Sequence, residues 1–141
     1  ARPNTQDVAG IHVDTFFGGV PNPAGSGPAV ANLFTLWIPV AGFSELYTLK
    51  IAPGSHLVVH PQKDFDDESN YITPSLDPDY ENEFEFIRLN LIKGEAIIIH
   101  PNLVHGASNN NGTDVRVSVD VRFFDNKNYA SLFDDNSVQF D

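Results

Sequence analysis

The sequence contains no cysteine and no methionine among its 141 residues. Without cysteine, the chain cannot form a disulfide framework, a thiolate nucleophile or a Cys-type zinc site. A bound metal ion would therefore need histidine and carboxylate ligands. Because methionine is missing even at position 1, we expect the chain to be a processed or N-terminally truncated version of a longer protein.

Basic residues are also scarce. Eight Lys and Arg stand against 19 Asp and Glu, which gives a formal net charge of −11. Such a chain repels phosphate groups, so we expect neither nucleic acid nor an anionic membrane as a partner. No apolar stretch is long enough to span a bilayer, and the first residues lack the apolar core of a signal peptide. We therefore expect a soluble, cytoplasmic protein.

The residues that are present predict one globular domain over residues 1–141. Hydrophobic residues make up 41% of the chain, which is enough for a packed core. Apolar runs of strand length alternate with clusters of Gly, Pro, Asn and Asp, and no long window has a helical period. The expected strands cover residues 8–16, 32–40, 47–52, 84–91, 96–99 and 115–124.

Short strands without intervening helices predict a mainly β, all-β fold. Among such folds, the jelly roll or double-stranded β-helix, a cupin-like barrel, is the form that encloses a small-molecule site. Two long loops, 17–28 and 62–83, are expected to be lids, binding loops or disordered segments. The sequence does not decide whether the tail 129–141 forms a short helix.

The segment Ile11-His12-Val13-Asp14 is the first candidate for chemistry. On a strand, His12 and Asp14 leave the same face. An imidazole beside a carboxylate is two thirds of the two-His, one-carboxylate triad that binds non-haem Fe(II). By itself the pattern is equally typical of a hydrogen-bonded pair on an ordinary strand.

The segment 94–106 offers a third ligand. His105 follows a turn at Pro101-Asn102, and Gly106 beside it permits a close approach of the backbone. His100 is the alternative ligand; it precedes a proline, which favours an extended or turn conformation. We expect His105 to complete the site.

The segment 115–124 alternates cleanly between apolar and polar residues. We expect the apolar side, which includes Val117 and Val119, to pack. The polar side consists of Arg116, Ser118, Asp120 and Arg122. It is either the solvent-exposed face of a half-buried strand or the interior lining of a jelly roll. In the second case Arg116 can fork onto a carboxylate and Ser118 can add a hydroxyl.

Five motifs in this order resemble the phytanoyl-CoA dioxygenase family of Fe(II)- and 2-oxoglutarate-dependent oxygenases. They are His12-Val13-Asp14, Trp37-Ile38-Pro39-Val40, Ala52-Pro53-Gly54-Ser55-His56, His105-Gly106, and Arg116 eleven residues after His105. The resemblance extends from residue 10 to about residue 124.

The resemblance implies an enzyme, a hydroxylase that uses O2 and acts on a small molecule. It implies that His12, Asp14 and His105 ligate Fe(II). It also implies that Arg116 pairs with the distal carboxylate of 2-oxoglutarate and that Ser118 completes an Arg-x-Ser pattern. The sequence says nothing about oligomeric state.

Two residues on one face of the expected strand 32–40 are further candidates for contact with the co-substrate. Thr35 is a candidate to give a hydroxyl to 2-oxoglutarate. Core packing is the default for Trp37, with a wall of the co-substrate pocket as the alternative. His56 is expected to be structural, in a tight turn.

The substrate class is indicated only coarsely. The string 116–123 is similar to a subgroup of the family found with sugar and antibiotic-type biosynthesis, which favours a sugar-related compound or a secondary metabolite. An acidic run, Asp64 to Glu68, disfavours coenzyme A thioesters. Two other functions stay open: a cupin-like isomerase or epimerase without 2-oxoglutarate, and a non-catalytic, carbohydrate-binding jelly roll.

Overall fold

A computed structural model of the chain describes residues 10–15, 33–58, 60–61 and 76–124. The expected loop 17–28, residues 62–75 of the second expected loop, and the tail 129–141 lie outside the described residues. The same holds for both ends of the expected strand 8–16.

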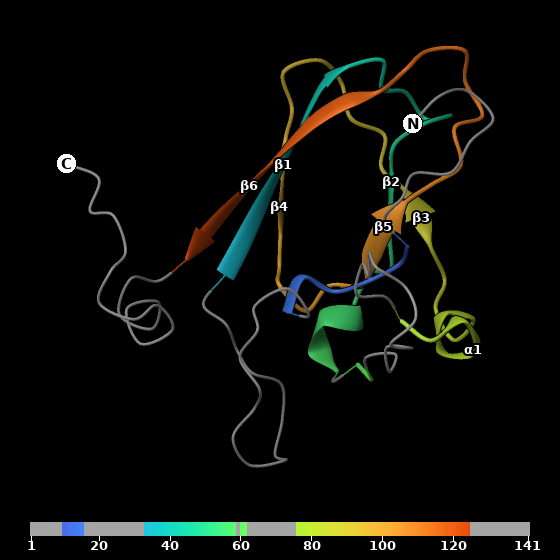
Figure 1. Cartoon of the computed structure of the whole chain (residues 1–141), viewed down its shortest axis with the longest axis vertical. Helices are drawn as coiled ribbons and strands as arrows, with labels where there is room; N and C mark the ends of the chain where they lie inside the picture. The colour runs from blue at the N-terminus through green and yellow to red at the C-terminus, as the bar shows by residue number, and fades with distance from the viewer. Residues whose placement is uncertain (1–9, 16–32, 59, 62–75, 125–141) are drawn as a thin grey trace, which may run out of the picture.

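The described residues form two three-stranded antiparallel sheets (Figure 1). The first has the order β4-β1-β6, with β4 at Ile97–Ile99, β1 at Leu33–Ala41 and β6 at Val117–Phe124. The second has the order β3-β2-β5, with β3 at Ile87–Arg88, β2 at Leu49–Ile51 and β5 at His105–Ala107. The prediction of a mainly β fold is confirmed.

Helical structure in the described part is limited to single turns. A 3-10 turn, η2, covers Ser55–Leu57, and α1 covers Pro78–Glu81. The N-terminus of α1 is capped by Asp77, whose side chain accepts a hydrogen bond from the backbone N–H of Asp79, and Pro78 occupies the first turn. No helix in the described ranges is long and apolar enough to cross a membrane.

Five of the six expected strands contain an observed strand, although most are shorter than expected. The first expected strand, 8–16, is different: its described part makes one isolated bridge, between His12 and His105. β5 had not been predicted as a separate strand, because a three-residue segment that contains a glycine carries little strand signal. It forms because it pairs with β2.

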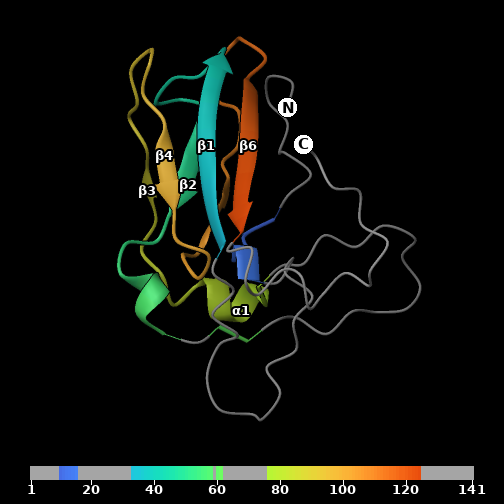
Figure 2. The ribbon, with the colours of Figure 1, turned by 90° about the vertical axis from the view of Figure 1, so that its left-hand side faces the viewer.

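Segment 10–15 connects the two sheets at the end of the molecule where α1 lies (Figures 1 and 2). The backbones of His12 and His105 exchange two hydrogen bonds, and the N–H of Thr15 donates to the carbonyl of Pro101. On the other side, the carbonyl of Ile11 accepts from the N–H of Leu76, just before α1. These bonds hold residues 10–13 in an extended form without a full strand, and Asp14 and Thr15 lie in a 3-10 turn.

Alternation along segment 10–15 decides which side chains reach the core. Ile11 and Val13 are buried in an apolar cluster completed by Ala52, Leu76 and Val104. His12, next to them in the extended part, and Asp14, in the 3-10 turn, line the pocket between the sheets instead. A second cluster of Trp37, Leu49 and Ile99 joins β1, β2 and β4 beside that space.

The expectation that the apolar side of β6 packs is wrong for the described part of the chain. Val117 is 50% exposed, Val119 46% and Phe123 53%. Their strand partner β1 contributes Phe34 to the same outer face. Both core clusters and the second sheet lie on the other side of β6, where its polar residues point.

Candidate functional site

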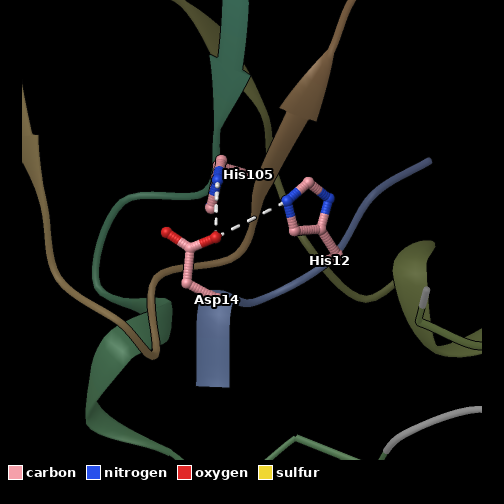
Figure 3. Close-up of side chains that lie close together, drawn as sticks. All are labelled: His12, Asp14 and His105. Atoms are coloured by element: carbon pink, nitrogen blue, oxygen red, sulfur yellow. Dashed lines mark ion pairs between the residues drawn. The ribbon is translucent and has the colours of Figure 1, made fainter. Parts of the chain in front are cut away.

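Three buried side chains converge where segment 10–15 crosses β5 (Figure 3). An oxygen of Asp14, Oδ1, lies 3.8 Å from Nε2 of His12 and 3.9 Å from Nε2 of His105. One ligand atom from each residue lies within 4.8 Å of the others, and all three residues are buried. The structure thus brings together the three residues that the sequence predicted as metal ligands.

Both histidines turn their Nε2 atoms toward Asp14. Nδ1 of His12 lies 2.7 Å from the carbonyl of Gly10, and Nδ1 of His105 lies 2.8 Å from the carbonyl of Leu103. A carbonyl oxygen can only accept a hydrogen bond, so each Nδ1 carries the proton and donates it. In the neutral form of each ring this leaves Nε2 as a lone pair facing Asp14, which is how metal-binding histidines are oriented.

The charge state of His12 also suits a ligand. The pKa of His12 is lowered to about 4, mainly by burial and in addition by the neighbouring His105. The hydrogen bond to Gly10 and the carboxylate of Asp14 oppose this shift. His12 is therefore neutral at neutral pH, as a metal ligand must be.

The carboxylate of Asp14 has partners on both of its oxygens. Oδ2 accepts a hydrogen bond of 2.5 Å from the hydroxyl of Thr35 on β1. Oδ1, the oxygen that faces the histidines, lies 3.5 Å from Nη2 of Arg122 on β6. Asp14 is 1% exposed and Thr35 2%, so this arrangement lies inside the protein.

A cavity of about 190 Å³ adjoins the three residues. Its lining includes Arg116 and every second residue after it: Ser118, Asp120 and Arg122. Of the two interpretations of this polar row, the structure supports the pocket lining. The outer, solvent-facing side of β6 is the apolar one.

Arg116 is held in the pocket by two aromatic rings. Its guanidinium carbon lies 4.5 Å from the ring centre of Tyr47 and 5.4 Å from that of Trp37. Arg116 is only 9% exposed. Trp37 is both part of the core, as expected by default, and a wall of the cavity. Stacking fixes the plane of the guanidinium without using its N–H donors.

The rim of the pocket carries two opposite charges. Partial burial raises the pKa of Asp120 above the usual value for an aspartate, and the nearby carboxylate of Asp14 acts in the same direction. The guanidinium of Arg122 opposes the shift. Asp120 is exposed and the side chain of Arg122 is 37% exposed, so solutes can reach both.

The other histidines do not join the site. His100, the alternative third ligand, is exposed and lies beside His56, with 5.3 Å between the ring centres. Its Nδ1 accepts a hydrogen bond from the backbone of Asn102. His60 is buried, with its ring nitrogens near the hydroxyl of Tyr80 and the carbonyl of Ser55. Neither belongs to the cluster of His12, Asp14 and His105.

Gly106 allows His105 to approach segment 10–15. A Cβ at this position would lie 2.8 Å from the carbonyl oxygen of Gly10 and 2.8 Å from Cδ1 of Ile11. Real Cβ atoms do not come so close to backbone atoms, so the glycine is needed for the pairing of His105 with His12. The sequence-based prediction of a close backbone approach is confirmed.

A comparison with protein families identifies the chain. The sequence model of the family described as phytanoyl-CoA dioxygenase matches residues 2–118. The chain belongs to the phytanoyl-CoA dioxygenase family. Membership implies an oxygenase of the Fe(II)- and 2-oxoglutarate-dependent kind and leaves the substrate unspecified. No curated protein matches the chain significantly.

Two features of this family member had escaped the sequence analysis. Tyr47 was expected only as the start of a strand, yet its ring covers the guanidinium of Arg116. The hydroxyl of Thr35 was considered for 2-oxoglutarate, whereas it donates to Asp14. The sequence places Thr35 and Trp37 on one strand face, but nothing local indicates which distant residue they meet.

Proposed function

We propose that the chain is an Fe(II)- and 2-oxoglutarate-dependent dioxygenase that hydroxylates a small molecule. We further propose that residues 1–141 form a single domain of the double-stranded β-helix type. One observation carries the functional proposal. The buried cluster of His12, Asp14 and His105 opens into the same pocket as the stacked guanidinium of Arg116.

The donor set suits iron. Two neutral imidazole nitrogens and one carboxylate oxygen are the ligands of the facial triad, which leaves coordination positions for co-substrates. With iron bound, the site would supply the oxidation in which a substrate C–H, 2-oxoglutarate and O2 become C–OH, succinate and CO2. The residues of the chain bind and orient the reactants and exclude water.

In this proposal Arg116 binds the distal carboxylate of 2-oxoglutarate. A guanidinium is always charged and matches a carboxylate with two parallel hydrogen bonds. Ser118 lines the same cavity and is proposed to add a hydroxyl. Trp37 is proposed as the wall that shields the charge pair from water, which strengthens it.

The size of the pocket supports a proposed position for the substrate. A cavity of about 190 Å³ is smaller than the roughly 300–1,000 Å³ that drug-sized ligands occupy. It suits a compact co-substrate, so we place the substrate over the rim formed by Asp120 and Arg122. A polar rim agrees with a sugar-related compound or a polar secondary metabolite.

The test is succinate release from 2-oxoglutarate by the intact chain. We expect release to require added Fe(II) and to disappear in Asp14→Ala, which removes the only carboxylate of the cluster. Release that persists in Asp14→Ala would overturn the assignment. Binding measurements separate the alternatives. A cupin-like isomerase would bind metal but not 2-oxoglutarate, and a carbohydrate-binding module would keep its ligand affinity after chelation.

A further inference from the structure

The two oxygens of Asp14 have different surroundings. Oδ1 faces Nε2 of His12 at 3.8 Å and Nε2 of His105 at 3.9 Å. Oδ2 points away from them and accepts the hydroxyl hydrogen of Thr35 at 2.5 Å. Arg122 also approaches Oδ1, at 3.5 Å, but its side chain is partly exposed. The bond from Thr35 is thus the short, buried contact that sets the rotation of the carboxylate.

Thr35 is itself held rigidly. It lies in the middle of the first sheet, with Ile99 on one neighbouring strand and Arg122 on the other. It is 2% exposed, and a β-branched side chain has few rotamers to choose from. A hydroxyl on such a support fixes the position of its acceptor.

One hydroxyl group has one hydrogen to donate. Because Thr35 donates it to Asp14, the same hydrogen is not available to a carboxylate of 2-oxoglutarate. The contact in the structure therefore favours a role of Thr35 toward the metal ligand over a direct role toward the co-substrate.

We propose that Thr35 is a positioning residue, which holds Asp14 so that Oδ1 meets the two histidine Nε2 atoms at one point. This inference rests on the proposed function, because it assumes that Asp14 is a metal ligand. Hydrogen bonds to ligating carboxylates typically change metal affinity by about 10- to 100-fold. Thr35 does this from β1, whereas the three ligands come from segment 10–15 and β5.

The test measures binding of Co(II) to the intact chain, without 2-oxoglutarate and without turnover, by visible absorption. Thr35→Val keeps the branched shape and removes the hydroxyl, and Thr35→Ser keeps the hydroxyl and removes the methyl group. We expect the dissociation constant to rise about 10-fold or more in Thr35→Val and to stay within about 3-fold of wild type in Thr35→Ser. Thr35→Ala is a second variant without the hydroxyl, and thermal unfolding shows which variants are folded.

Unchanged Co(II) affinity in the folded variants without the hydroxyl would overturn the proposal, even if 2-oxoglutarate bound more weakly. Equal losses in Thr35→Val and Thr35→Ser would also overturn it, because packing rather than the hydroxyl would then matter. Failure of the proposed function looks different. A wild-type chain that binds no Co(II) lacks the metal site, and one that binds Co(II) but releases no succinate lacks the activity.

Discussion

His12 and His105 are joined by two reciprocal backbone hydrogen bonds, of 2.9 and 3.0 Å, although they lie near opposite ends of the described chain. The pairing sets their imidazole rings side by side, with 4.5 Å between the ring centres. Two of the three candidate metal ligands are therefore positioned by the backbone, and Asp14 by the hydroxyl of Thr35.

The first prediction concerns the identity of the third ligand. We expect His105→Gln to weaken Fe(II) or Co(II) binding more than about 100-fold, because a direct ligand contributes more than the supporting contacts around it. His100→Gln is the matched control, since His100 is exposed and lies beside His56. Isothermal titration of both variants measures the difference. A larger loss in the His100 variant would reverse the assignment.

The second prediction concerns Arg116. We expect Arg116→Gln to weaken 2-oxoglutarate binding about 10- to 100-fold, because hydrogen bonds to charged groups are worth about 1.5–3 kcal/mol. Metal affinity should be unchanged. The chain contains one Trp, and Arg116 lies 5.4 Å from its ring, so Trp37 fluorescence reports binding directly.

Lys93→Gln serves as the control for Arg116→Gln, because it removes one positive charge from an exposed position. Equal affinities for 2-oxoglutarate in wild type and Arg116→Gln would remove Arg116 from its proposed role. A similar loss in both variants would indicate an effect of net charge.

The third prediction concerns the close approach at Gly106. A Cβ there would lie 2.8 Å from the carbonyl oxygen of Gly10, and moving a backbone atom away costs more free energy than moving a flexible side chain. We expect Gly106→Ala to lower the free energy of unfolding by about 1–3 kcal/mol and to weaken metal binding, because it separates His105 from His12. Urea unfolding and metal titration measure the two effects.

Gly112→Ala is the control for this substitution. Its Cβ would meet its nearest neighbour, Oδ1 of Asn110, at 3.4 Å, an ordinary contact. We expect it to change stability by no more than about 0.5 kcal/mol. If Gly106→Ala is equally mild, the backbone of β5 adjusts more easily than the structure indicates.

The fourth prediction concerns pH. Burial lowers the pKa of His12 from 6.5 to about 4 in the folded chain. Between these values the unfolded chain binds a proton that the folded chain does not, so protonation favours unfolding. In the metal-free protein, a neutral His12 therefore contributes to stability above pH 6.5. This contribution is lost as the pH falls from 6.5 toward 4. The full loss is roughly 3 kcal/mol at 1.4 kcal/mol per pKa unit.

Many carboxylates titrate in the same range, so the measurement compares wild type with His12→Asn. We expect the free energy of unfolding of wild type to fall more steeply between pH 7 and pH 4.5 than that of His12→Asn. Parallel curves would show that His12 titrates normally in the folded chain.

Much of the fold and of the donor set could be predicted from the sequence, because the signals are local. Alternation predicts His12 and Asp14 on one side and Ile11 and Val13 on the other, and the structure has them so, although Asp14 lies in a 3-10 turn. The same alternation separates the polar from the apolar side of β6. The absence of cysteine restricts a metal site to histidine and carboxylate ligands.

Which side of β6 faces the pocket could not be read from the alternation, because both sides of a strand obey it equally. The sequence analysis expected the apolar side to pack and left open whether the polar side faces solvent or lines the interior; the second sheet lies against the polar side. Sheet partners depend on pairing between segments that are distant in the sequence, and the local sequence does not indicate which segments will pair.

By itself the sequence determined the available ligands, the faces on which they lie, and the resemblance to the family that the chain belongs to. Tertiary structure alone decided that His105 rather than His100 meets His12, that Thr35 donates to Asp14, and that Tyr47 covers Arg116. The physical reason is distance along the chain. Side-chain direction is a property of neighbouring residues, whereas these contacts arise only when segment 10–15, β1 and β5 come together.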